Sequence, residues 1–160
     1  MTDIIDASKF ELRKAAIADV KQIQKLVNQY AKREDMLPRS LNEIYENIRD
    51  FSVCTLDDHI IAVAALHVLW EDLAEVRSVA VMIKYQKHGA GSKLVKKCLK
   101  EAVKLGISKV FALTYTPGFF NKLGFEVIDK NTLPQKIWGE CLKCHKFPDC
   151  DETAVIKQLS

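Results

Sequence analysis

The sequence predicts a mixed α/β fold in which one sheet has helices on both faces. Short apolar stretches typical of strands alternate with longer segments whose apolar residues recur every three or four positions, as in amphipathic helices. An apolar strand also enters a glycine-bearing loop at 86–91 that opens directly into one of these helices. A strand, a crossover helix and a second strand predict a parallel pair joined by a right-handed connection.

The first half of the chain is expected to hold four strands and two helices. Asp19 suits the positive end of the first helix, and Ser40 with Glu43 forms a capping box for the second. In order, we expect a half-buried strand over 10–13, a helix over 20–30, a helix after Pro38 with an apolar stripe of Leu41, Ile44, Tyr45 and Ile48, strands over 51–56 and 60–69 joined by a turn at 57–59, and a strand ending near Ile83.

The second half begins with a helix over 91–105, and Gly106 is a natural residue to end it. Its apolar stripe comprises Leu94, Val95, Cys98, Leu99, Ala102 and Val103. The remaining expected elements are a buried strand over 110–113, a short helix over 117–123 that stops at Gly124, a strand over 125–127, and a last strand over 153–159.

Length and composition favour one globular domain over residues 1–160. The net charge of +3 is too small to predict a nucleic-acid partner, and no apolar stretch reaches the roughly 18 residues of a membrane span. The N-terminus lacks the pattern of a secretory signal, and the cysteine count is odd, at five. We therefore predict a cytoplasmic protein without membrane or nucleic-acid partners, with a homodimer left open.

The loop Gln86–Gly91 is the candidate ligand site. A strand feeding a glycine turn at a helix start presents several backbone N–H groups at the positive end of the helix dipole, which suits a pyrophosphate. The order of residues fits neither a Walker loop nor a GxGxxG fingerprint, and a purely structural turn remains the alternative. Five lysines on the following helix (Lys93, Lys96, Lys97, Lys100 and Lys104) predict a solvated face, with a few of them near phosphates as the alternative.

The pattern Gln-x-x-Gly-x-Gly, preceded by Val79-Ala80-Val81 and followed by 119–125, resembles the GNAT superfamily of acetyl-CoA-dependent N-acetyltransferases over nearly the full length. The resemblance implies a mostly antiparallel central sheet with a splayed parallel pair, and acetyl-CoA as co-substrate. The cofactor-binding residues that it implies are Val79, Ala80 and Val81 along the pantetheine arm, the loop residues Gln86, Lys87, His88, Gly89, Ala90, Gly91 and Ser92, and Asn121.

Glu75 is the candidate general base, because acetylation needs a neutral amine and a carboxylate can remove its proton. The alternative is an ion pair with Arg77, since residues i and i+2 share a strand face. Many members of the superfamily have a tyrosine as general acid where this chain has Phe120. Thr114 and Tyr115 are the nearby hydroxyl substitutes, with ordinary strand-end hydrogen bonding as the alternative.

Within the superfamily the chain resembles the N-acetylglutamate synthases, in a short form without an amino-acid kinase domain. The resemblance rests on the segments 36–40, 65–75, 110–114 and 129–138. It implies acetylation of the α-amino group of glutamate, the opening step of arginine synthesis. A substrate with two carboxylates needs cationic partners, for which Arg39, Arg77 and Lys136 are the candidates. A different amine as acceptor, or a cofactor-binding sensor without turnover, remains an alternative.

Two further features each leave alternatives open. The cluster Cys141, Cys144, His145 and Cys150 has metal-ligand residue types, but packing or a disulfide explains it as well, and we predict no metal. Trp70 is expected in the core, with a wall of the substrate pocket as the alternative.

Overall fold

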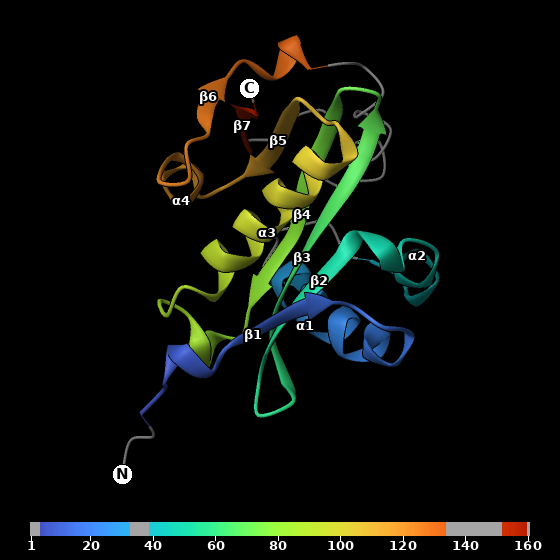
Figure 1. Ribbon diagram of the computed structural model, residues 1–160, viewed down its shortest axis with the longest axis vertical. Helices are drawn as coiled ribbons and strands as arrows, with labels where there is room; N and C mark the ends of the chain where they lie inside the picture. Colours follow the sequence, from blue (N-terminus) through green and yellow to red (C-terminus); the bar gives the residue numbers. More distant parts are fainter. Residues whose placement is uncertain (1–3, 33–38, 134–151, 160) are drawn as a thin grey trace. The chain divides into compact units, whose positions relative to one another are not determined.

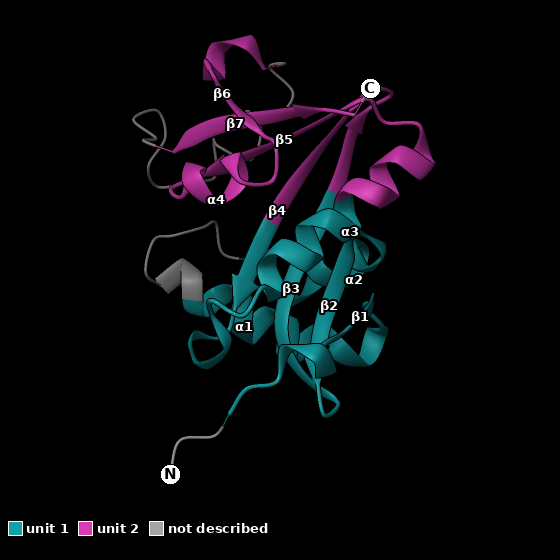
Figure 2. Cartoon of the chain, turned by 60° about the vertical axis from the view of Figure 1, so that its left-hand side comes forward, with its two compact units in different colours: residues 1–66, 78–98 teal, residues 67–77, 99–160 magenta. Residues whose placement is uncertain are grey.

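The computed structural model describes residues 4–32, 39–133 and 152–159. The chain divides into two compact units (Figure 2): unit 1 comprises residues 1–66 and 78–98, and unit 2 comprises residues 67–77 and 99–160. Seven strands form one sheet in the order β1-β2-β3-β4-β5-β7-β6. Strands β4 and β5 are parallel, whereas β1–β2, β2–β3, β5–β7 and β6–β7 pair in antiparallel fashion. The predicted mixed, mostly antiparallel sheet is confirmed.

Figure 1 labels the elements along the chain. The helices are α1 (Val20–Lys32), α2 (Leu41–Glu46), α3 (Ala90–Leu105) and α4 (Pro117–Asn121). The strands are β1 (Glu11–Lys14), β2 (Phe51–Leu56), β3 (His59–Trp70), β4 (Leu73–Val81), β5 (Lys109–Thr114), β6 (Glu126–Ile128) and β7 (Thr153–Gln158). Short 3-10 turns cover Ala7–Lys9, Ile17–Asp19, Ile48–Asp50, Ile83–Tyr85 and Lys130–Thr132. Every predicted helix and strand is therefore present, with bounds that differ by a few residues.

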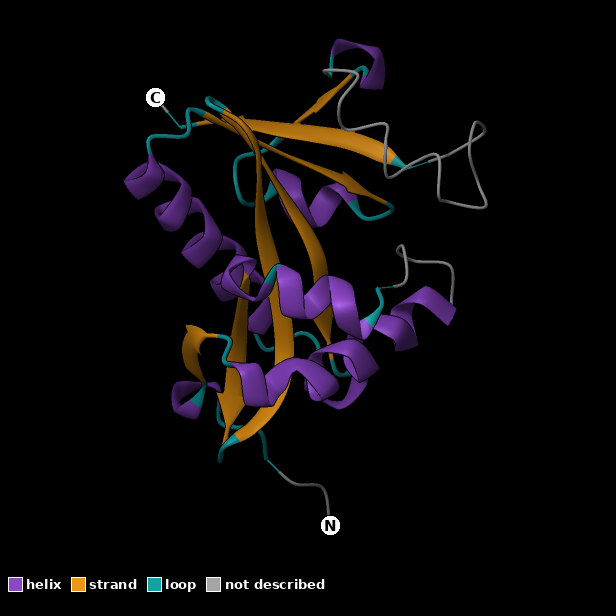
Figure 3. Ribbon diagram, turned by 90° about the vertical axis from the view of Figure 1, so that its right-hand side faces the viewer, coloured by secondary structure: helices purple, strands orange, loops and turns teal. Residues whose placement is uncertain are grey.

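The core of unit 1 forms where α1 and α2 pack on one face of β2 and β3. Its buried side chains are Val20, Ile23, Leu26, Val27, Ile44, Phe51, Val53, Ile60, Val63, Ala65 and Ala80. The Ser40 half of the predicted capping box is confirmed, because the Ser40 hydroxyl accepts a hydrogen bond from the Glu43 N–H at 3.1 Å. Cys54 and Ala64 point to the opposite face and are also fully buried. Both faces of these strands are thus covered, and Figure 3 shows helices on both sides.

The hairpin between β2 and β3 turns on two residues rather than the three predicted. Asp57 and Asp58 both have left-handed backbones, with φ of 50° and 66°. Two successive left-handed residues form the turn whose twist matches that of antiparallel strands, and aspartate tolerates this conformation better than most residues. His59 therefore lies in β3 rather than in the turn.

Several predicted core positions are exposed. Val103 at the margin of the α3 stripe is 57% exposed, and Tyr45 of α2 is 40% exposed. Ile83 is 61% exposed, because β4 ends at Val81 and Ile83 lies in a 3-10 turn. All four residues of β1 are exposed rather than alternating, in a short strand at the edge of the sheet. Periodicity predicted the elements correctly but not the width of each buried face.

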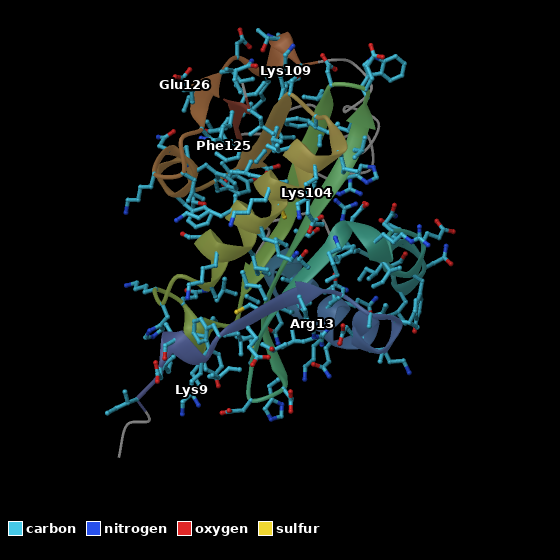
Figure 4. The ribbon with its side chains drawn as sticks, viewed as in Figure 1. Lys9, Arg13, Lys104, Lys109, Phe125 and Glu126 are labelled. Carbon is cyan, nitrogen blue, oxygen red and sulfur yellow. The ribbon has the colours of Figure 1, made fainter. Side chains whose placement is uncertain are left out.

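Unit 2 is organised around β5, which pairs with the start of β4 on one side and with β7 on the other. The predicted last strand, β7, is present, but it lies between β5 and β6, so that β6 rather than β7 is the edge of this part of the sheet. Phe120 of α4 packs edge-on against Phe125, with ring centroids 5.2 Å apart (Phe125 is labelled in Figure 4). Among the helices in the described ranges, none is long and apolar enough to cross a membrane.

An ion pair fixes the entry of the chain into α1. Arg13 of β1, labelled in Figure 4, donates from its two terminal nitrogens to the two carboxylate oxygens of Asp19, at 2.7 and 3.0 Å. The Ala16 N–H donates to the same carboxylate at 2.7 Å. Hydrogen bonding from the Arg13 guanidinium lowers the pKa of Asp19. The carboxylate is therefore held in its charged form, directly before the positive end of α1.

We expect Asp19→Asn to destabilise the protein by about 1–3 kcal/mol at pH 7, because it removes charged hydrogen bonds at a nearly buried site. The pKa of Asp19 is lower in the folded than in the unfolded protein, so its contribution is complete above the unfolded value near 3.9 and is lost as the pH falls through the folded value. Urea unfolding between pH 7 and pH 2 measures both effects, and the variant should lose less stability than the wild type below pH 4.

Glu11→Gln is the matched control, since it removes one negative charge from an exposed position on β1, the strand that carries Arg13. It should change the free energy of unfolding little at pH 7 and retain the acid-dependent loss. An acid-dependent loss of equal size in Asp19→Asn and in the wild type would contradict the assignment.

Candidate functional site

The loop between β4 and α3 in unit 1 has a backbone that few sequences adopt. Lys87 has φ of 69° and Gly89 has φ of 89°, while His88 between them is not left-handed. Such alternation turns successive N–H groups toward one side and forms a concave anion-binding backbone. The side chain of Gln86 donates to the Val81 carbonyl at 3.3 Å and ties the loop to the end of β4. Lys87, His88 and Gly89 are all exposed.

The first turn of α3 adds further N–H donors to the same loop. The helix ladder begins with the Lys93 N–H, which donates to the Gly89 carbonyl at 3.0 Å. The N–H groups of Ala90, Gly91 and Ser92 come before this bond and have no acceptor one helical turn earlier. The first turn contains no acidic residue, so the positive end of the helix dipole is not neutralised there. This arrangement can bind a phosphate group through backbone atoms.

The first lysine of α3 has a partner outside the loop. Lys93 donates to the Ala7 carbonyl at 3.4 Å, and its ammonium lies 5.6 Å from the centre of the Phe10 ring. It therefore anchors the N-terminal segment on α3. Lys96 and Lys100 are exposed, which is the solvated face that the sequence predicts.

The end of β4 presents two half-buried side chains on one face. Val79 and Val81 alternate with Ala80, which is 1% exposed and belongs to the core under α1 and α2. Ala80 therefore lies on the opposite face from the two valines. Directly before them, Ser78 is 8% exposed and has a left-handed φ of 57°, which is rare for a serine inside a strand. Sequence reasoning missed this residue, because no sequence pattern marks a left-handed serine.

The parallel ladder between β4 and β5 is short. It pairs Leu73 with Lys109, Ala74 with Val110, and Glu75 with Phe111, and it does not extend to Val76 or beyond in the described chain. Strand β5 continues to Thr114 in its ladder with β7. The predicted parallel pair thus parts after Glu75, three residues before the left-handed serine.

Glu75 and Arg77 form the ion pair that the sequence left open as an alternative. An oxygen of Glu75 lies 3.7 Å from a guanidinium nitrogen of Arg77, and the two side chains are 15% and 11% exposed. This contact orients the carboxylate and also occupies one of the candidate substrate-binding arginines. The ion pair does not exclude Glu75 as a general base, because a neighbouring cation can hold a basic carboxylate in position.

The two candidate hydroxyls differ in their surroundings. The Thr114 oxygen accepts the Thr116 N–H at 2.9 Å and lies 3.1 Å from the Thr116 hydroxyl, so it makes the strand-end hydrogen bonds of the alternative interpretation. Tyr115, the next residue, is half-buried. Phe120 is buried among aromatic rings, whereas Asn121 at the end of α4 is exposed.

Arg39 is a buried cation in unit 1. Its side chain is 8% exposed, and one guanidinium nitrogen lies 3.5 Å from a carboxylate oxygen of Glu43. Its backbone is held by α1: the Asn28 side chain accepts the Arg39 N–H at 3.1 Å, and the amides of Asn28 and Gln24 both donate to the Arg39 carbonyl at 3.3 Å. Sequence reasoning found Arg39 but missed the two amides, because helical spacing marks them only as neighbours on one face.

The remaining sequence predictions concern Trp70, Lys136 and the cysteine cluster. Trp70 is 55% exposed at the end of β3, so the core prediction is wrong for it. Lys136 and the cluster of Cys141, Cys144, His145 and Cys150 lie outside the described residues. Within the described ranges, no group of three or more histidine, cysteine, aspartate or glutamate residues is arranged to hold a metal ion.

The sequence matches a family model and several named proteins. The model of the Acetyltransferase (GNAT) family covers residues 17–125. An uncharacterized N-acetyltransferase of Chlorobaculum tepidum is 38% identical over 92% of this chain and 96% of its own length. An amino-acid acetyltransferase of Mycobacterium tuberculosis is 34% identical over 84% of this chain and 78% of its own length. The amino-acid acetyltransferase of Escherichia coli K12 is longer, and this chain matches 31% of it at 29% identity.

Solved structures show the same fold. A Mycobacterium tuberculosis structure in complex with CoA and NLQ has a TM-score of 0.80 and 30% identity, over 94% of this chain and 99% of that one. N-acetylglutamate synthase from Neisseria gonorrhoeae, complexed with coenzyme A and N-acetyl-glutamate, has a TM-score of 0.86 over 94% of this chain and 35% of that one. Its identity is 24%, so this second likeness extends to the fold alone.

We expect Ser78→Gly to leave the free energy of unfolding within about 1 kcal/mol of the wild type, since glycine adopts a left-handed backbone without strain. Ser78→Val should cost at least about 1–3 kcal/mol, because a β-branched residue is strongly disfavoured at positive φ. Chemical denaturation of both variants compares them directly. Equal stability of the glycine and valine variants would contradict the left-handed conformation.

Proposed function

The chain belongs to the GNAT family of acetyltransferases, and on this premise we propose that it transfers the acetyl group of acetyl-CoA to the α-amino group of glutamate. The observation that carries the proposal is the backbone of residues 87–92, where left-handed turns and the first turn of α3 direct N–H groups to one side. The relatives named amino-acid acetyltransferases support an amino acid as acceptor.

In this proposal the backbone N–H groups of 88–92 bind the pyrophosphate of acetyl-CoA. The exposure of Lys87, His88 and Gly89 supports it, since a phosphate can approach the loop from solvent. The pantetheine arm then lies along Val79 and Val81, whose half-buried faces offer apolar contact. Backbone N–H groups near Val79 stabilise the negative charge that develops on the thioester oxygen during attack.

Glu75 acts as the general base. It accepts a proton from the substrate ammonium, directly or through water, and the neutral nitrogen attacks the thioester carbon. The carbon–sulfur bond breaks, and the leaving thiolate takes a proton from a hydroxyl, for which Thr114 and Tyr115 are the proposed donors. The nitrogen loses its second proton as the amide forms, and this proton returns through water to the hydroxyl. Arg77 keeps the Glu75 carboxylate oriented, which the 3.7 Å ion pair supports.

Arg39 binds a carboxylate of the acceptor. A buried guanidinium offers forked hydrogen bonds that match a carboxylate, and its backbone is already fixed by α1. Lys136 remains a proposed second cation. Glutamate as acceptor places the reaction at the opening of arginine biosynthesis, in the cytoplasm.

The proposal is tested by thiol release from acetyl-CoA with glutamate, aspartate, lysine, a polyamine and short peptides as acceptors. Glutamate should give the highest kcat/KM. Faster turnover of another amine would contradict the assigned acceptor but keep the acetyltransferase chemistry. Binding of acetyl-CoA without turnover of any amine would instead support a sensor module.

We expect Glu75→Gln to lower kcat at neutral pH by about 10²–10⁴-fold, the usual contribution of a general base. The loss should shrink at high pH, where more of the amine is already neutral. Acetyl-CoA affinity, measured by calorimetry, should stay within about twofold because the side chain is not placed on the phosphate loop. A pH–rate profile unchanged from the wild type would remove Glu75 as the base.

A further inference from the structure

Side-chain amides of α1 make several hydrogen bonds to the backbone of one residue, Arg39, just before α2. The Asn28 side chain makes two hydrogen bonds with the backbone of Arg39, accepting its N–H at 3.1 Å and donating to its carbonyl at 3.3 Å. Gln24, one helical turn earlier on α1, donates to the same carbonyl at 3.3 Å. Three bonds from two side chains thus converge on a single peptide segment, and we refer to Gln24 and Asn28 as the amide clamp.

The clamp acts on the residue that enters α2. Arg39 directly precedes Ser40, whose hydroxyl caps the helix by accepting the Glu43 N–H. The backbone of Arg39 is therefore fixed from α1 through the clamp and from α2 through the cap. Its side chain is 8% exposed, and its guanidinium lies 3.5 Å from Glu43. A buried, forked cation recognises a carboxylate only if its position is set within a few tenths of an ångström.

We propose that Gln24 and Asn28 are positioning residues, which set the affinity for the acceptor's carboxylate by holding the backbone of Arg39. This inference rests on the proposed function of Arg39 and goes beyond it, because neither amide contacts substrate in the proposed mechanism. Both amides are half-buried on one face of α1, so the clamp is preformed before any substrate binds.

The test is a double-mutant cycle in the glutamate assay. Asn28→Ala removes two of the three bonds and should raise the KM for glutamate at least about fivefold, with kcat and the KM for acetyl-CoA within twofold. Gln24→Ala removes one hydrogen bond and should raise the KM for glutamate about twofold. Gln29→Ala, at an exposed position of the same helix, is the matched control and should change neither constant.

The decisive comparison uses Arg39→Ala as the background. If Asn28 acts through Arg39, adding Asn28→Ala to Arg39→Ala should not raise the KM for glutamate further. A penalty that persists in this background, or a loss of kcat and acetyl-CoA affinity together, would contradict the inference and leave a structural role. Turnover of glutamate by the wild type would show that this outcome contradicts the inference alone and not the proposed function. Absence of glutamate turnover in the wild type would contradict the proposed function and, with it, the inference.

Hydrogen exchange of the Arg39 amide reports directly on whether the amide clamp is formed. Asn28→Ala should accelerate hydrogen exchange of the Arg39 amide, because that N–H loses its acceptor, and should leave exchange in the α3 ladder unchanged. Unchanged protection at Arg39 would show that the clamp does not hold it and would overturn the inference.

Discussion

The turn from β4 into α3 is the constraint on which the candidate cofactor site depends. A Cβ atom added at Gly89 would meet no atom beyond the neighbouring residues within 4 Å, so this position needs glycine for its left-handed φ of 89° rather than for space. The same open surroundings leave room for a ligand beside the backbone. Because the proposed donors are N–H groups, whose direction is fixed by the chain, the proposed anion site would be formed before a ligand arrives.

In the proposed mechanism, backbone groups bind the cofactor and side chains bind the acceptor. The proposed phosphate contacts are backbone atoms, while the side chains around the loop serve the fold: Gln86 ties it to Val81, and Lys93 holds the N-terminal segment. The proposed acceptor contacts are side chains, above all the buried Arg39.

Local signals in the sequence predicted most of the fold. The hydroxyl cap of Ser40 on the Glu43 N–H and the helical period of α1 involve residues within a few positions of each other, and both are confirmed. Features that arise from long-range packing were not predictable in the same way. The exposure of Trp70 and Val103 depends on which neighbours cover each face, which periodicity does not encode.

The candidate site shows the same division. The Gln-x-x-Gly-x-Gly pattern pointed to the phosphate loop, and its first glycine, Gly89, has the left-handed backbone that glycine adopts without strain. The left-handed Ser78 and the amide contacts to Arg39 have no such mark, since serine and asparagine adopt many local roles. The sequence left Glu75 either as a general base or as the ion-pair partner of Arg77. The structure shows the ion pair, which is also compatible with the proposed role as a base.

The most direct test of the central claim is the calorimetric affinity of acetyl-CoA for Ser92→Glu. A carboxylate in the first turn of α3 occupies the N–H donors and neutralises the dipole, while it should stabilise the helix itself. Our account predicts at least about tenfold weaker binding, equivalent to about 1.4 kcal/mol, without a lower melting temperature. Lys100→Gln changes the charge of the same helix equally at an exposed position and should bind normally. Wild-type affinity in Ser92→Glu, or equal weakening in both variants, would contradict the account.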